Sequence, residues 1–300
     1  MWNGTRTRTE IIPPKKQTVW RWPAVINFSL GGMGAGLYLW GLLLSWLQGD
    51  LPSAFAIKVG GPLLVALGLA SLSHEAGRPL RGIHLWRHVR SSWMSREAVA
   101  AGIFIPLAVL DWLFPHPVLR TVAGLAALFF MVAQGFIPYR GRGVTAWYVP
   151  HVPVMFATSG PMTGFGLLVL LAAFTGFSVP PALWWLGVLF ILANAGVWWH
   201  YLNQEPSDTA FQRALEILRQ PVAMIWVMGI GHALPFVFLV VAGATGPTEG
   251  AARLLALVGG AALLVGGTLQ KAYLILEAGY LRAITFGPVH PPRHSPATTP

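Results

Sequence analysis

The sequence predicts an all-α membrane protein of about eight transmembrane helices. Of its 300 residues, 55% are hydrophobic and only 10% are charged, whereas a soluble domain carries roughly 25% charged residues. So few charges cannot cover a surface that faces water. Because a helix needs about 20 apolar residues to cross a bilayer, the chain has room for about eight crossings and for no large soluble domain.

Eight apolar segments account for these crossings, and each is bounded by charged residues, proline or glycine. The first four are expected at 24–47, at 54–73, from 98 to about 113 and at 118–137. The fifth and sixth lie within 143–204, separated by a break at 179–181, and the last two are expected at 220–248 and at 254–276. The stretch 143–204 contains no Asp, Glu, Lys or Arg, and it is long enough for two crossings.

Three segments differ from these spans. Residues 74–97 hold five arginines, three histidines and two tryptophans, a composition typical of a basic loop or an amphipathic helix in the membrane interface. Residues 1–22 form a basic tail without the apolar core of a signal peptide. Residues 287–300 are rich in proline and are expected to be disordered. The domain boundaries that follow are 1–22, 23–286 and 287–300.

The distribution of positive charge predicts the orientation. An even number of crossings places both termini on one face, here called the terminal face. The opposite face then holds only Lys58, Arg120 and Arg253. The positive-inside rule places the terminal face in the cytoplasm, and so predicts a multi-pass protein of the inner membrane. The net charge of +10 is explained by these loops, and nucleic-acid binding is not expected.

The absence of cysteine limits the chemistry. It excludes a chain-borne iron–sulfur cluster, a thiolate zinc site, a disulfide framework and a thiol nucleophile. His84 and His88 have the spacing of metal ligands, but without a third ligand we predict no metal site. Any redox centre must belong to a partner or to a bound small molecule.

The first crossing contains a run of glycines from Gly31 to Gly36. A dinucleotide-binding fingerprint needs a preceding strand, and this run lies inside an apolar helix. Gly32 and Gly36 instead form a small-xxx-small pair that allows close helix packing. Asn27, one turn inside the membrane, is expected either to form an interhelical hydrogen bond or to contact a ligand.

His74 and Arg78 are candidates for proton chemistry at the terminal face. Being four residues apart, they share one face of a continuing helix. An imidazole near neutral pH can take a proton from a quinol hydroxyl as an electron leaves. The alternative is that both side chains only contact lipid headgroups.

Polar residues inside the crossings are costly and therefore informative. Gln134 and His151 are expected near the terminal face, Asn194 and His232 deeper, and Asp111 near the opposite face. They could form a proton path, or each could serve only helix packing. His200 and His232 are the one plausible pair of ligands for a b-type haem, but their expected depths differ by about half a span.

Several motifs resemble those of the NrfD/PsrC family, the membrane subunits of polysulfide reductase-type enzymes, and of the related DMSO reductase (DmsC-type) anchor subunits. The first helix carries Trp-Arg-Trp at 20–22, followed by the asparagine and glycines of 27–36. Residues 73–81 and 90–97 resemble the second loop of that family, and 271–280 resemble its last helix. The resemblance extends over about 20–286, and the loop motif is its most specific part.

This resemblance implies eight helices in two four-helix bundles without haem in this chain. It also implies a site for a quinone, menaquinone or ubiquinone, on the face where partners bind. The implied partners are a ferredoxin-like four-cluster iron–sulfur subunit and a catalytic subunit that contains molybdopterin, with membrane lipid around the bundle.

Site residues can be carried over from the resemblance. His74 matches the histidine that serves the menaquinol site of DmsC-type subunits. Asn27 falls where polysulfide reductase subunits have a histidine that contacts quinone. Gln134 or its neighbour Ala133 falls near their quinone-contacting tyrosine, which is absent here. Arg78 and His151 lie at the same level and complete the set of candidate quinone-binding residues.

The sequence therefore predicts a quinone-reactive membrane anchor of a molybdenum iron–sulfur oxidoreductase, which does not itself perform the substrate chemistry. Two alternatives remain: an anchor that binds haem b, and a secondary transporter. The transporter would be expected to show inverted repeats, and no convincing internal repeat is evident in the sequence.

Overall fold

The computed structural model describes residues 9–49, 54–75, 87–247 and 250–286. Within them, eight helices are long and apolar enough to cross a membrane, which confirms the predicted fold class. They are α1 (Trp22–Gln48), α2 (Ala54–Glu75), α3 (Trp93–Leu113), α4 (Pro117–Tyr139), α5 (His151–Thr175), α6 (Pro181–Leu202), a seventh crossing formed by α8 (Pro221–Met224), η2 (Ile225–Ala233) and α9 (Leu234–Thr245), and α10 (Gly250–Ala272), extended by η3 (Tyr273–Glu277).

The start of α3 differs from the expected boundary. Residues 93–97 were predicted to lie with the basic segment in the interface, but the structure places them in the first turn of a crossing helix. The Ser92 side chain caps this helix by accepting a hydrogen bond from the backbone N–H of Ser95. The prediction failed because Glu97 looks interfacial by charge alone, whereas in the fold its carboxyl group is buried against amide donors.

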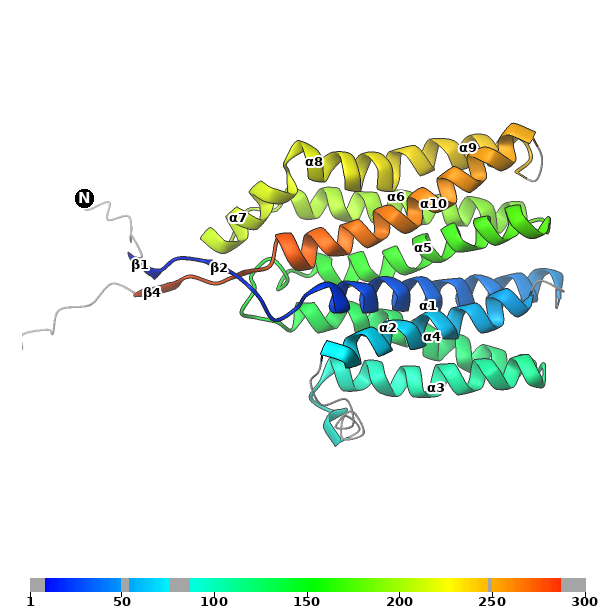
Figure 1. Cartoon of the computed structure of the whole chain (residues 1–300), viewed down its shortest axis with the longest axis horizontal. Coiled ribbons are helices and arrows are strands. Elements are labelled where there is room, and N and C mark those ends of the chain that lie inside the picture. The colour runs from blue at the N-terminus through cyan, green and yellow to red at the C-terminus, as the bar shows by residue number, and fades with distance from the viewer. Residues whose placement is uncertain (1–8, 50–53, 76–86, 248–249, 287–300) are drawn as a thin grey trace, which may run out of the picture.

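The crossings pack in two groups (Figure 1). We call α1–α4 the first helix group, and α5, α6, the seventh crossing and α10 the second helix group. The groups meet where α1 and α4 pack against α5. Gly36 lies so close to α5 that a Cβ atom there would collide with the carbonyl oxygen of Gly160, and Gly32 also lies against Gly160. The predicted packing role of Gly32 and Gly36 is thereby confirmed.

Both ends of the described chain meet beyond the same end of the helices (Figure 1). Strand β1 (Thr9–Ile12) pairs with β4 (Ile284–Phe286), and β2 (Lys15–Lys16) pairs with β3 (Tyr280–Leu281), both antiparallel. Part of the basic N-terminal segment is thus held against the C-terminal segment, an arrangement that no sequence pattern predicted. Residues 287–300, expected to be disordered, lie outside the described residues.

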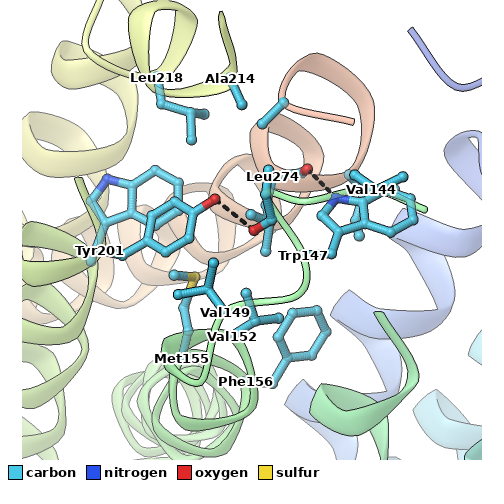
Figure 2. Close-up of a cluster of buried hydrophobic side chains, with 14 of the residues drawn as sticks. Val144, Trp147, Val149, Val152, Met155, Phe156, Tyr201, Ala214, Leu218 and Leu274 are labelled. Carbon is cyan, nitrogen blue, oxygen red and sulfur yellow. Dashed lines mark hydrogen bonds between the residues drawn. The ribbon is translucent and has the colours of Figure 1, made fainter. Parts of the chain in front are cut away.

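A buried hydrophobic cluster lies at the terminal face, between the α4–α5 connection and the second helix group (Figure 2). The Trp147 indole donates a hydrogen bond to the Leu274 carbonyl oxygen at 2.9 Å. The Tyr201 hydroxyl donates to the Ala146 carbonyl oxygen at 2.8 Å. A short amphipathic helix, α7 (Thr209–Leu218), contributes Ala214 and Leu218 to the same cluster. These contacts hold the α4–α5 connection, α6, α7 and η3 together at the terminal face, where the candidate site lies.

Candidate functional site

Three polar side chains from three helices meet inside the first helix group near the terminal face. We call Asn27 of α1, Glu97 of α3 and Gln134 of α4 the amide–carboxyl cluster. The Glu97 Oε1 atom accepts hydrogen bonds from Asn27 Nδ2 at 3.2 Å and from Gln134 Nε2 at 3.0 Å. Gln134 Nε2 also lies 3.2 Å from the Asn27 carbonyl oxygen. No residue of the cluster is more than 1% exposed.

Glycines make room for this cluster. A Cβ atom at Gly31, on α1, would collide with the Gln134 side-chain nitrogen. Gly68, on α2, lies against the backbone and side chain of Asn27. The glycine-rich helix α1 therefore has two roles. It packs closely against α5, and it leaves room for the Gln134 side chain of α4 to reach the Glu97 carboxyl group.

The cluster can bind and release protons and hydrogen-bonding ligands. Both donors to Glu97 are neutral amides, and none of the ion pairs seen in the described part of the chain includes Glu97. A carboxyl group held in this way can take up or give off a proton without breaking a salt bridge. Asn27 Oδ1 is buried and has no hydrogen-bond partner among the described residues. Such an orphaned acceptor suits a ligand hydroxyl or a water.

A pocket of about 450 Å³ opens on the terminal face, one helical turn from the cluster. Its walls include Trp93, four residues before Glu97 on α3, and Ile137, three residues after Gln134 on α4. Trp93 stacks on Phe136 with ring centroids 4.3 Å apart. The Arg96 guanidinium lies 4.4 Å from the Trp93 ring centroid. The pocket thus combines a flat aromatic wall with positive charge, beside a buried carboxyl group.

Of the residues proposed from the sequence, the structure brings Asn27 and Gln134 together. The backbone of His74 lies in the last turn of α2, but its side chain lies outside the described part of the chain, as does Arg78. The Ser71 hydroxyl, one turn earlier, donates to the Pro23 carbonyl oxygen at 3.0 Å. The end of α2 therefore packs at the start of α1, on the side of the membrane that holds the cluster.

His151 takes a different position. It begins α5, and its ring lies 4.7 Å from the His200 ring, centroid to centroid. No hydrogen bond between described residues joins it to the amide–carboxyl cluster, and its Nδ1 atom is buried without a partner in that part of the chain. His151 is therefore not joined to the cluster, although α4 and α5 pack closely at Gly135 and Pro153.

Sequence reasoning missed Glu97 as a site residue. The available signal was a lone carboxylate immediately before a long apolar run, which can be read as the edge of a loop. Its partners Asn27 and Gln134 are 70 and 37 residues away along the chain, so no local pattern reveals them.

Two further groups of polar residues lie within the crossings. Near the opposite face, Asp111 Oδ2 lies 3.4 Å from Lys58 Nζ and 3.2 Å from Arg120 Nε. In the second helix group, His232 Nδ1 lies 2.7 Å from the Val227 carbonyl oxygen and its Nε2 lies 2.9 Å from Asn194 Oδ1. A role for His232 as a haem ligand would require it to give up one of these contacts.

Comparison with known proteins identifies the family. The family model for the DMSO reductase anchor subunit (DmsC) matches residues 16–228, which include all of the amide–carboxyl cluster. The C subunit of the polysulfide reductase of Wolinella succinogenes is 27% identical over 194 residues, which cover 53% of this chain and 60% of the relative. The chain thus spans less than two thirds of that relative. Because the family model matches well over half of the chain, the protein belongs to the DMSO reductase anchor subunit (DmsC) family.

Proposed function

We propose that this chain is the quinone-reactive membrane anchor of a molybdenum iron–sulfur oxidoreductase. In this proposal it exchanges electrons between menaquinone or ubiquinone and a ferredoxin-like four-cluster iron–sulfur subunit, which connects to a molybdopterin catalytic subunit. Family membership and the polysulfide reductase relative support the general role. The observation that carries the quinone site is a buried carboxyl group, held by two amides, beside a pocket with an aromatic wall.

The residues present fit a quinone head group. A quinol that gives up two electrons also gives up two protons, and its hydroxyl groups donate hydrogen bonds. Asn27 Oδ1, which has no partner among the described residues, can accept such a bond. The pocket is lined by two aromatic side chains, Trp20 and Trp93, against which an aromatic ring can pack. The Glu97 side chain is only 1% exposed, so the proton acceptor is shielded from bulk water.

Each residue of the cluster has a distinct role in this proposal. Glu97 accepts a proton, and Gln134 and Asn27 hold its Oε1 atom in one position. His74 and Arg78 are retained in the proposed set, His74 as a second proton acceptor, because the last turn of α2 reaches the same end of the first helix group. His151 is the least supported member of the proposed set, because its ring packs against His200.

We place the partner subunits on the terminal face and, from the charge distribution, that face in the cytoplasm of the inner membrane. Apart from Lys58, Arg120 and Arg253, the positive charges are predicted from the sequence to fall on this side. Electron transfer also requires the quinone to lie near a cluster of the partner, and the pocket opens on the terminal face. The paired strands extend the surface there on which a soluble subunit could dock.

The test is a Glu97→Gln substitution in the complete complex. Gln keeps the size of the side chain and an oxygen acceptor for both amides, but it cannot take a proton. Removal of a proton acceptor typically costs about 10²- to 10⁴-fold in rate, so we expect quinol-coupled turnover to fall in that range. Turnover driven by a soluble redox dye, which bypasses the membrane subunit, should stay unchanged.

The matched control is Glu216→Gln, because Glu216 is an exposed carboxylate on α7. It should leave both activities intact. Equal activity of Glu97→Gln and the wild-type complex with quinol would refute the proposed site, and so would an equal loss of quinol-coupled and dye-coupled activity.

A further inference from the structure

A groove between the two helix groups has no part in the proposed quinone site. It has a volume of about 440 Å³ and is lined by α1, α4, α5 and α6. Buried residues such as Trp40 and Pro161 form its bottom. Leu125 and Leu128 of α4, which are 61% and 43% exposed, form its rim. We call this space the inter-group groove.

Close helix packing separates the inter-group groove from the terminal face. Val132 of α4 and Ala157 of α5 are the residues of these two helices that line its end on that side. Three residues beyond Val132, a Cβ atom at Gly135 would collide with the backbone of Pro153 on α5. The two helices thus meet between the groove and the terminal face, where the amide–carboxyl cluster lies.

The other end of the groove reaches the opposite face. Thr121, which lines it there, is four residues from the start of α4 at Pro117. Trp46 also lines this end, two residues before the end of α1, and is 60% exposed, as is typical of a tryptophan at the membrane boundary. From Thr121 to Val132 the groove follows α4 for about 16 Å. That length is close to half of a hydrocarbon core about 30 Å thick.

The side chains of the groove offer almost no hydrogen bonds. Trp40, Trp46 and Thr121 are the described lining residues whose side chains carry an N–H or O–H group. The Trp40 indole already donates to the Pro161 carbonyl oxygen at 2.8 Å, and the other two lie at the end toward the opposite face. A ligand with polar groups would lose its hydrogen bonds in the deeper part, which is costly. The groove therefore suits a hydrocarbon chain.

A crossing helix of a partner or of a second copy does not fit this space. With its side chains a helix is about 10–12 Å wide, so one turn occupies roughly 400–600 Å³, and the groove holds only about one turn. Helix interfaces in membranes also favour small residues, whereas leucine and aromatic side chains dominate this lining. Its glycine, Gly124, is turned toward α1, because a Cβ atom there would collide with the Leu42 side chain.

We propose that the inter-group groove binds one acyl chain of a phospholipid from the leaflet at the opposite face. The chain enters at the end near Trp46 and Thr121, which places the lipid headgroup at the membrane boundary, and its methyl end lies near Val132 and Ala157. In the groove it contacts four helices, whereas a chain on the outer surface has protein on one side only. The additional dispersion contacts favour the bound position.

The bound chain has a structural role that is independent of the quinone site. The helix groups meet directly where Gly36 of α1 approaches Gly160 of α5. In the inter-group groove, α4 of the first group and α6 of the second leave a space between them, lined by residues such as Leu128 and Phe190. An acyl chain in this space joins the two groups on the side of the opposite face.

Photolabelling of the complete complex tests this site. The complex is incorporated into phosphatidylcholine vesicles that contain a phosphatidylcholine with a diazirine at the end of one acyl chain. It is then extracted in detergent, freed of loosely bound lipid and illuminated. Mass spectrometry of peptides should find the label near Val132 and Ala157. Val258, 42% exposed on α10 and outside the groove, should be labelled before extraction but not after it.

The decisive variant is Ala157→Phe, which fills the deep end of the groove and should abolish the label that survives extraction. Ala244→Phe is the matched control, because Ala244 is exposed on α9 toward the opposite face and does not line the groove. Leu128→Trp, at the open rim, should give the same loss without placing new bulk in a packed core. Added phosphatidylcholine should raise the melting temperature of the delipidated wild type and of Ala244→Phe, but not that of Ala157→Phe.

Three results would overturn the assignment. One is a wild-type complex without label near Val132 and Ala157 after extraction. The second is a label that persists in both Ala157→Phe and Leu128→Trp. The third is loss of the label on adding excess menaquinone, because the groove would then hold an isoprenoid chain instead of a phospholipid.

Discussion

Substitution of Asp111 by Asn should destabilise the protein strongly, because Asp111 compensates two buried cations at the opposite face. Its Oδ2 atom lies 3.4 Å from Lys58 Nζ and 3.2 Å from Arg120 Nε. Lys58 and Arg120 are each 8% exposed, and Asp111 is fully buried. Asn keeps the oxygen that accepts from the His116 backbone N–H at 3.2 Å, so the substitution removes the charge and little else.

The size of the effect follows from the burial of the three groups. Removing one partner of a buried ion pair costs about 3–5 kcal/mol, since the other partner is left uncompensated. For soluble domains of 150–250 residues, 1 kcal/mol shifts the melting temperature by about 2–4 °C. Taking the lower slope for this longer chain, we expect Asp111→Asn to melt about 6–10 °C below the wild type.

The assay is thermal unfolding of the purified protein in a fixed lipid–detergent mixture. Glu216→Gln is the control, because an exposed carboxylate on α7 should contribute less than about 0.5 kcal/mol. Adding Lys58→Met to Asp111→Asn should recover part of the loss, because one of the two cations that face Asp111 is then removed. A melting temperature of Asp111→Asn equal to that of the control would refute the reasoning, and so would a double variant less stable than Asp111→Asn alone.

Three further outcomes are expected. Gly36→Leu should prevent assembly of the two helix groups, because the leucine side chain would collide with the backbone of α5 at Gly160. Size-exclusion chromatography after expression should show aggregation of this variant. The control Gly196→Leu should elute normally, because the space around Gly196 is open. His74→Gln should reduce quinol-coupled but not dye-coupled turnover, and retained quinol turnover would remove His74 from the proposed site. Trp147→Phe should lower stability by about 1 kcal/mol in denaturant titration, because the Leu274 carbonyl oxygen loses its donor; an unchanged midpoint would contradict this.

The crossings could be predicted from the sequence because each depends on a local property. A long apolar run must form a helix in lipid, where every backbone polar group needs an internal partner. The breaks at Pro180 and Pro181 and the charged or glycine-rich connections then set the ends to within a few residues. The close packing of α1 at Gly32 and Gly36 was also predictable, but the identity of the opposite helix, α5, was not.

The candidate site could be predicted only in part, because its partners are distant in sequence. Asn27 and Gln134 were visible as amides inside apolar helices, but the group that joins them, Glu97, stands at the border of a basic segment. Whether such a carboxylate faces water or the protein interior depends on donors from other helices. The strand pairs at the termini were hidden for the same reason, as shown by the Lys16–Glu277 pair, whose members are 261 residues apart.

The π-helical segment around His232 could not be predicted either. Its sequence, Ile225–Ala233, is as apolar as an ordinary crossing. Hydropathy does not distinguish a π-helix, in which hydrogen bonds span five residues, from an α-helix, in which they span four. The position of His232 in depth was predictable, but the two acceptors that face its ring follow from this local winding and from Asn194 of another helix.

The arrangement of charge within the first helix group limits where protons for the proposed quinone site can come from. Glu97 and Asp111 lie on the same helix, 14 residues or about 21 Å apart along its axis. The buried side chains of α3 between them, Ala100, Ala101, Phe104 and Ala108, are all apolar. A proton does not cross such an interval without a polar partner, so α3 offers Glu97 no route toward the ion pairs of Asp111. The side chains of α3 thus favour proton exchange between Glu97 and the terminal face over transfer along this helix toward Asp111.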